Sequence, residues 1–190
     1  MKKTFTEGVT YENKNFIANL LVYGDYEDCV FNNCNFSDSD LSGYMFSGCT
    51  FNGCNLSLVK ITLTSFQDVT FKNCKILGLH FDDCNKMLFS VEFDNCSLNV
   101  SSFYKLKMRK TIFKNSSVCE ADFTEADLSN SVFDNCDLTR TTFRNTNIER
   151  VDFLTSYNFR IDLEVNSCKK AKFSLSGLAG LLEKYDIEIL

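Results

Sequence analysis

Residues 121–153 read ADFTEADLSNSVFDNCDLTRTTFRNTNIERVDF, and this stretch decides the fold. A Phe, Leu or Ile stands at every fifth residue from Phe123 to Phe153, and we call these positions the centres. Two residues before each centre lies a small side chain, such as Ala121, or a Cys, such as Cys136. A repeat of five matches neither the period of a strand nor that of a helix. It therefore predicts a short unit that repeats in space.

The same spacing extends over most of the chain. One set of phenylalanines recurs every twenty residues, apart from a single interval of twenty-two. A single coil cannot bury its own Phe, so the coils above and below must cover it. Each buried ring then contributes about 1.5–3 kcal/mol before chain entropy is counted. This core ladder consists of Phe31, Phe51, Phe71, Phe93, Phe113, Phe133, Phe153 and Phe173.

The unit resembles that of the pentapeptide-repeat family, which reads roughly A-(D/N)-L-x-x, with Cys, Ser or Val also first and Phe also third. The resemblance covers about residues 16–173. It implies an all-β fold, a right-handed quadrilateral β-helix with four faces, in which twenty residues make one coil and about eight coils stack. We expect residues 1–173 to form this solenoid, with a register break near 83–91. Residues 174–190 are expected to form a C-terminal capping and dimerisation helix and strand.

Two further regularities fit a square cross-section. Asn or Gly recurs two residues after the ladder phenylalanines, and both tolerate the left-handed backbone of a tight corner. Seven of the ten Cys occupy small inward positions, where Cys acts as a small apolar side chain. Without a C-x-x-C motif and with one His, the chain is expected to hold free thiols and no metal. The corner residues are Asn33, Gly53, Asn73, Asn95, Asn115 and Asn135, and the inward cysteines are Cys29, Cys34, Cys49, Cys54, Cys74, Cys96 and Cys136.

The register breaks once. Phe81 and Phe93 are twelve residues apart, two more than two units span. We expect Leu88 to be the new centre, with Asn85 and Lys86 as a bulge, because an unpaired buried ammonium group is costly. The insertion is either a tolerated loop without function or a recognition loop. The recognition loop would consist of Asn85, Lys86 and the exposed side chains of Met87 and Phe89.

No catalytic constellation is found in the sequence. His80 precedes a centre and should point outward, without a neighbouring Ser or Cys nucleophile. The chain lacks a P-loop, a G-x-G-x-x-G motif and an H-E-x-x-H motif. We therefore expect no enzyme and no cofactor. The N-terminal residues carry no apolar stretch that would indicate a signal peptide or membrane span, so the expected location is the cytoplasm.

The acidic residues gather on one side. The formal net charge is −5, and the repeat assigns a set of acids to the face of Leu41, Ile61 and Phe81. Lys60, Lys105 and Arg144 oppose them there. The charges either keep the rod soluble or imitate DNA for a DNA-binding protein. The acids are Asp40, Asp82, Asp83, Asp122, Glu125, Asp162 and Glu164, and a basic band of Lys105, Lys107, Arg109, Lys110 and Lys114 interrupts the acidic surface.

The repeat stops after Phe173. Leucines then recur at helical spacing, Ser174 or Ser176 is placed to cap a helix, and isoleucines alternate at the end as in a strand. The apolar outer surface of this segment predicts a twofold contact with a second copy. The expected interface residues are Leu178, Leu181, Leu182, Tyr185, Ile187 and Ile189.

This ending resembles the quinolone-resistance (Qnr-type) branch of the family, as does YGDYEDCVFNNCNFSDSDLSG at residues 23–43. The resemblance implies a homodimer through the C-terminal segment and a rod that imitates B-form DNA. It also implies binding to DNA gyrase or topoisomerase IV and protection from quinolones. No direct contact with nucleic acid or membrane is expected. The long projecting loops of many members are missing. The alternative function is a structural or scaffold solenoid that mediates protein–protein interaction.

Overall fold

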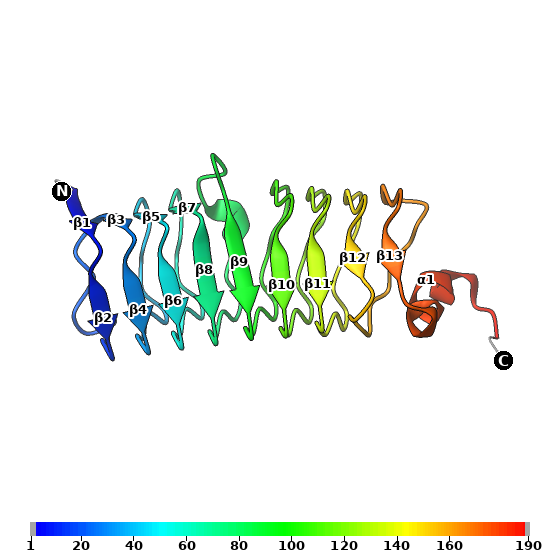
Figure 1. Cartoon of the computed structure of the whole chain (residues 1–190), viewed down its shortest axis with the longest axis horizontal. Helices are drawn as coiled ribbons and strands as arrows, with labels where there is room; N and C mark the ends of the chain where they lie inside the picture. The colour runs from blue at the N-terminus through cyan, green and yellow to red at the C-terminus, as the bar shows by residue number, and fades with distance from the viewer. Residues whose placement is uncertain (1–2, 189–190) are drawn as a thin grey trace.

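The protein is an elongated parallel β-solenoid of about eight turns with one short C-terminal helix, as Figure 1 shows. The computed structural model describes residues 3–188. Within them, the side that faces the viewer in Figure 1 is a parallel sheet of nine short strands. These are β2 (Thr10–Glu12), β4 (Val30–Asn32), β6 (Thr50–Asn52), β8 (Val69–Lys72), β9 (Val91–Asp94), β10 (Ile112–Lys114), β11 (Val132–Asp134), β12 (Asp152–Phe153) and β13 (Lys172–Phe173).

The four-sided winding expected from the sequence is confirmed. We number the faces in chain order within a turn, starting with the nine-stranded sheet as face 1. Faces 2 and 3 are held by isolated parallel bridges, such as Ser117↔Asp137 on face 2 and Ser102↔Asp122 on face 3. Face 4 carries a four-stranded sheet in the N-terminal half and isolated bridges, such as Lys107↔Asp127, in the C-terminal half. The four strands are β1 (Thr4–Glu7), β3 (Gly24–Glu27), β5 (Met45–Ser47) and β7 (Ser65–Gln67).

Stacked aromatic rings fill the interior. Successive rings of the core ladder lie nearly parallel, with centroids 4.5–5.4 Å apart. A second column on face 3 runs from Phe81 to Phe143, with centroids 4.7–5.4 Å apart. Rings of the two columns meet edge to face, as Phe113 and Phe123 do at 90°. Both arrangements are favourable for aromatic quadrupoles. Phe173, at the end of the ladder, is half-buried.

The corners explain the preference for Asn and Gly. The six corner residues that follow face 1 have φ between 49° and 65°, in the left-handed region. Their amides also bond from turn to turn. Asn95 donates to Asn73 at 2.8 Å, and Asn135 donates to Asn115 at 2.9 Å. Asn therefore supplies both the left-handed backbone and a side-chain ladder along the rod.

The small inward position selects for a short hydrogen-bond donor. The Cys54 thiol donates to the Phe31 carbonyl at 3.2 Å, and the Ser156 hydroxyl donates to the Phe133 carbonyl at 2.7 Å. Cys and Ser replace one another because each satisfies a carbonyl of the preceding turn. All ten cysteines are free. Burial raises the pKa of Cys49 to about 12 and that of Cys136 to about 11, so these thiols stay protonated at neutral pH.

The register break differs from the sequence expectation. After the 3-10 helix η1 (Phe81–Asp83), the Asn85 amide group donates to the Ser65 hydroxyl at 3.0 Å and keeps the old register. Leu88 then turns outward, 71% exposed at φ 57°, while Phe89 is only 9% exposed and packs against the Phe81 ring. The expectations of a buried Leu88 and an exposed Phe89 are therefore wrong. The larger aromatic surface goes inside, and Leu88 takes the left-handed turn.

A C-terminal cap, residues 174–188, covers the last turn. It contains η2 (Leu175–Gly177), α1 (Ala179–Leu182) and η3 (Glu183–Tyr185), and the Ser174 hydroxyl accepts from the Gly177 amide at 3.2 Å. Gly180 lies so close to the last turn that a Cβ there would be 2.0 Å from the Phe159 carbonyl oxygen. Ile187 lies outside regular structure, so the expected strand is not formed there, and Ile189 lies outside the described residues. Among residues 3–188, no helix has the length and apolar run needed to cross a bilayer.

Candidate protein-interaction surface

Face 3 carries the acidic residues that the sequence assigned to it. Bridges from Asp40 to Lys60 and from Ser102 to Asp122 place these residues in one row along the rod. Asp82 and Asp83 follow the buried Phe81 in η1 on the same face. The structure thus spreads the predicted acids along one side instead of enclosing them in a pocket.

Basic side chains neutralise much of this face. Lys60 lies 3.6 Å from the Asp40 carboxylate, and Lys105 lies 3.3 Å from Glu125. The opposing Lys60 and Lys105 found in the sequence therefore act as direct ion-pair partners. Such exposed pairs contribute little stability, but they reduce the negative potential available to a partner.

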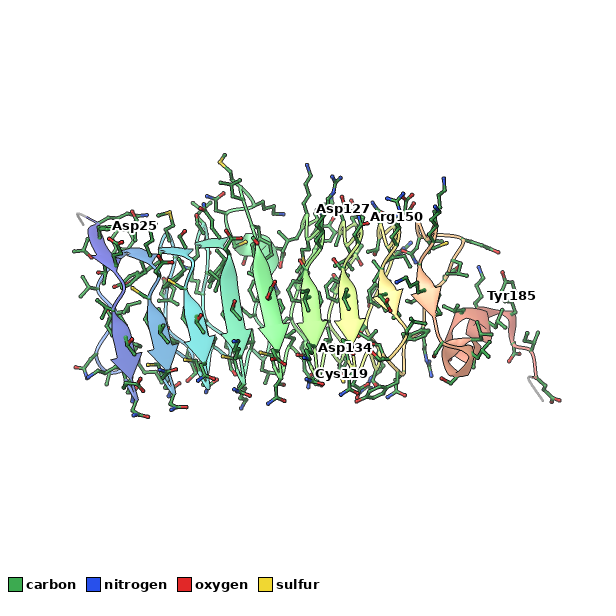
Figure 2. All side chains as sticks on the ribbon, viewed as in Figure 1. Asp25, Cys119, Asp127, Asp134, Arg150 and Tyr185 are labelled. Carbon is green, nitrogen blue, oxygen red and sulfur yellow. The ribbon has the colours of Figure 1, made fainter. Side chains whose placement is uncertain are left out.

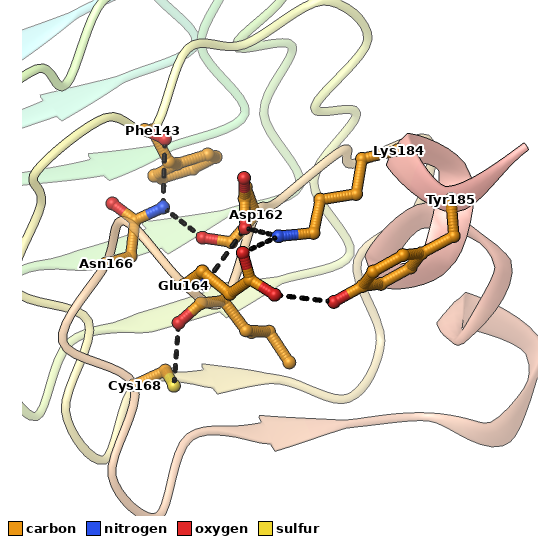
Figure 3. Close-up of polar contacts among 8 residues, drawn as sticks. Phe143, Asp162, Glu164, Asn166, Cys168, Lys184 and Tyr185 are labelled. Atoms are coloured by element: carbon orange, nitrogen blue, oxygen red, sulfur yellow. Dashed lines mark hydrogen bonds and ion pairs between the residues drawn. The ribbon is translucent and has the colours of Figure 1, made fainter.

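The two acids nearest the C-terminus are held by the cap, as Figure 3 shows. The Lys184 ammonium lies 2.5 Å from Asp162 and 2.8 Å from Glu164, and the Tyr185 hydroxyl donates to Glu164 at 2.8 Å. The hydrogen bond from Lys184 lowers the pKa of both carboxyl groups. Asp162 and Glu164 thus anchor the cap. No repeat in the sequence indicates this role of Lys184, because its partner Asp162 lies 22 residues earlier in the chain.

The middle of face 3 holds three acids that form no ion pair with Lys or Arg in the described residues, one exposed and two half-buried. Asp83 is exposed, and neither Asp83 nor Asp122 forms an ion pair with another residue in the described part of the chain. Asp122 accepts a hydrogen bond from the Thr124 amide at 2.8 Å. The Asp82 carboxylate lies 3.5 Å from the His80 ring, which carries charge only when protonated. We call Asp82, Asp83 and Asp122 the acidic centre of face 3.

The cap presents a different apolar surface from the one expected. Leu181 is 7% exposed and packs in the core of its own chain, so it is not available to a second copy. Leu175, which is not one of the expected interface residues, is 88% exposed. Leu178, Tyr185 and Ile187 are exposed as well, and Leu182 is half-buried. A helix this short needs an apolar side chain turned inward to hold it on the rod, and Leu181 has that role.

A cavity of about 760 Å³ opens beside the cap. Its walls include Arg140, Phe159 and Arg160 from the last turns, and Leu182 and Ile187 from the cap. Arg140 pairs with Glu120 at 2.6 Å, and Arg160 pairs with Glu183 at 2.8 Å. The hollow is therefore lined by both polar and apolar side chains, and ion pairs neutralise its two arginines.

Comparison with known sequences identifies the family of this chain. The family described as a pentapeptide repeat region matches residues 25–87 and 86–158. The chain belongs to the pentapeptide-repeat family. No curated protein matches its sequence.

Solved structures share the fold of this pentapeptide-repeat protein. A trypsin-treated form of QnrB1, a plasmid-mediated fluoroquinolone resistance protein, is 20% identical with a TM-score of 0.62, covering 98% of this chain and 100% of that one. Full-length QnrB1 is 19% identical with a TM-score of 0.58, covering 97% and 100%. HetL, a protein involved in heterocyst differentiation regulation from the cyanobacterium Nostoc, is 14% identical with a TM-score of 0.65, covering 93% and 90%.

Proposed function

We propose that this pentapeptide-repeat protein is a non-catalytic binding protein that dimerises through its C-terminal cap and engages a type II topoisomerase. In this proposal the rod takes the place of DNA on DNA gyrase or topoisomerase IV, and it protects the enzyme from quinolones. It acts through its outer surface, needs no cofactor and works in the cytoplasm without contacting nucleic acid or membrane.

The acidic centre of face 3 carries the proposal. It lies on a rod that matches QnrB1 over 97–98% of its length, although the identity of 19–20% extends the likeness to the fold alone. Carboxylates on a long, regular exterior present negative charge at fixed intervals, as a DNA backbone does. Asp82, Asp83 and Asp122 are the residues that we assign to partner binding, because ion pairs neutralise Asp40, Glu125, Asp162 and Glu164.

The proposed dimer uses the exposed part of the cap. We assign to the dimer contact the exposed apolar side chains of the cap, Leu175, Leu178, Tyr185 and Ile187. A twofold contact of this surface with itself is isologous and closed, so it gives a dimer and not a fibre. In the proposed dimer, the cavity beside the cap would receive a side chain of the partner copy.

A supercoiling assay with purified gyrase tests the proposal. We expect micromolar protein to restore supercoiling at a quinolone concentration that otherwise inhibits the enzyme, or to inhibit supercoiling when no drug is present. Replacement of Asp82, Asp83 and Asp122 by Asn should abolish the effect. The matched control replaces Glu92, Asp94 and Asp134 of face 1 by Gln or Asn and should retain it. No effect of the unaltered protein on either gyrase or topoisomerase IV contradicts the proposal.

The second candidate is a scaffold solenoid for another protein partner. The neutralised ends of face 3 favour it, since a full-length DNA imitation needs free acids along the whole rod. Capture experiments from a lysate without topoisomerase, followed by reconstitution with the purified partner, would support this candidate. A monomer in light scattering would favour it further.

A further inference from the structure

Face 4 is divided into two halves of opposite charge. In the N-terminal half most of its charged side chains are acids, and in the C-terminal half most are bases, apart from Asp127 and Glu149. Figure 2 shows labelled members of the two sets, Asp25 and Arg150, on the same upper edge near opposite ends of the rod. The acids are Glu7, Asp25, Glu27, Asp28 and Asp68, and the bases are Lys107, Arg109, Lys110, Arg150, Lys169 and Lys170.

Most of these charges have no partner of opposite sign in their own chain. Lys3 pairs with Asp25 at 2.6 Å, and Arg109 pairs with Asp127 at 2.6 Å. Across residues 3–188 the other acids and bases of the two sets form no ion pair. Two unpaired sets of opposite sign on one flat side are available for contact with a complementary surface.

The 85–90 loop lies midway between the two sets. It rises above the edge of the rod between β8 and β9 in Figure 1. Four turns with a left-handed corner after face 4 precede it, and four follow it. Equivalent corners are stacked by backbone hydrogen bonds, such as Asp28 N to Ser47 O and Arg150 N to Lys169 O. In chain order the corners are Gly8, Asp28, Gly48 and Asp68 before the loop, and Lys110, Asn130, Arg150 and Lys170 after it.

When a second copy of this row of corners is turned end for end about the loop, corners of opposite charge come to face each other. Asp68 then faces Lys110, and Asp28 faces Arg150. The neutral Gly48 faces Asn130, and Lys170 comes to lie beside Glu7. Turns are about 4.8 Å apart, so the matches stay in register along the rod. Glu27 opposite Glu149 is a like-charged match, and Arg150 lies next to it in the sequence.

We propose that face 4 binds face 4 of a second copy, antiparallel, with a twofold axis through the 85–90 loop. In an isologous contact, each half of one rod meets the opposite half of its partner. Met87 and Leu88, both 71% exposed, lie at the loop and contact their own copies across the axis. The loops hold the two faces apart, and the long Lys and Arg side chains reach across to the carboxylates.

A nucleic acid is a poorer occupant of this face. A duplex that lies along the rod would meet the acidic half as well as the basic half, and the chain carries a net charge of −5. The affinity for a duplex rises with the number of phosphates that Lys and Arg neutralise, and the acidic half of this face would repel it. A second copy fits both halves at once, which is why we assign the face to self-association.

Sedimentation velocity of the full chain tests this contact through its salt dependence. The Debye length falls from about 30 Å at about 10 mM salt to about 3 Å at about 1 M. We expect the weight-average mass at low salt to be at least double that at high salt, because each copy of a cap dimer carries its own face 4 and the association can extend beyond a pair. The apolar cap contact is not screened by salt, so it sets the high-salt mass and does not cause the change. An unchanged mass at the two salt concentrations overturns the proposal.

Charge reversal identifies the face. One variant carries Lys110→Glu, Arg150→Glu and Lys170→Glu, and another carries Glu7→Lys, Asp28→Lys and Asp68→Lys. Corner positions accept both residue types, since Lys105 and Glu125 have φ of 58° and 57° at equivalent corners. We expect each variant alone to lose the salt-dependent doubling, with a dissociation constant raised at least about tenfold. The control with Lys72→Glu, Lys75→Glu and Lys114→Glu should keep it.

An equimolar mixture of the two reversed variants completes the test. Each rod of the mixture carries charges of one sign along the row of corners, so the unlike rods should associate again at low salt. Restored doubling supports the antiparallel contact and also shows that both variants are folded. Failure of the mixture to associate contradicts it, as does doubling by either variant alone. A labelled DNA duplex that binds the basic half while the protein mass stays constant would assign the face to nucleic acid instead.

Discussion

The two halves of the rod share one interior and differ on the outside. On both sides of the 85–90 loop, the same aromatic column runs through the core at nearly constant spacing. Face 4, in contrast, is a sheet with acids before the loop and a set of isolated bridges with bases after it. The inward rows and the corners therefore define this fold in both halves. Outward rows are free to change sign within one face, and function must be sought there.

The largest expected change in stability comes from removing a core ring in each half of the rod, and it tests whether the two interiors are equivalent. Phe51→Ala in the first half and Phe133→Ala in the second each remove a fully buried ring from the core ladder. We expect each to lower the free energy of unfolding by about 3–5 kcal/mol. Urea denaturation followed by circular dichroism measures both. A loss below about 1 kcal/mol in one half would show that the two interiors are not alike.

The ends of the two halves differ because a cap covers the last turn. Leu181→Asp places a carboxylate in the core, and we expect a loss of at least about 3 kcal/mol. Leu175→Asp changes an exposed side chain and should leave stability within about 0.5 kcal/mol while it abolishes the cap dimer. Thermal unfolding and light scattering separate the two effects. A stable, monomeric Leu181→Asp protein would show that Leu181 belongs to the interface after all.

A smaller effect is expected where the cap touches the rod. Gly180→Ala adds a methyl group against the Phe159 carbonyl, and such overpacking costs about 1–3 kcal/mol. Gly8, at the opposite end, has open space around its Cβ position, so Gly8→Ala adds only the strain of its positive φ. Thermal unfolding of the two variants compares the ends. Equal destabilisation would mean that the cap does not pack against the last turn.

The smallest effect concerns pH. The pKa values of Asp162 and Glu164 are lowered by the hydrogen bond from Lys184, so their stabilisation of the cap is complete above the ordinary carboxyl range. It is lost as the pH falls through the lowered values, below about 4. We expect the protection factors of amides in residues 175–185, relative to intrinsic exchange at each pH, to fall in that range, and Lys184→Met to remove this fall. Exchange that follows pH equally in both proteins would argue against this anchor.

The sequence was sufficient to predict the regular rows of the interior. It was insufficient to predict contacts between segments that lie outside the repeat. The spacing of Phe, Cys and Asn predicts the ladder, the inward thiols and the corners, because each recurs at the period of the coil. The choice between Leu88 and Phe89 depends on the path of an inserted loop, which no period describes. Leu181 and Lys184 have roles that arise only when the cap folds back on the last turn.

The direct test of the account is binding of the dimeric protein to immobilised gyrase, compared between variants of the faces. We expect Asp82→Asn, Asp83→Asn and Asp122→Asn together to weaken binding at least about tenfold, since each removes a charge from the partner surface. The control with Glu92→Gln, Asp94→Asn and Asp134→Asn on face 1 should bind as the unaltered protein does. Equal binding by both triple variants, or no binding by the unaltered rod, would contradict the claim that the acidic centre of face 3 is the working surface.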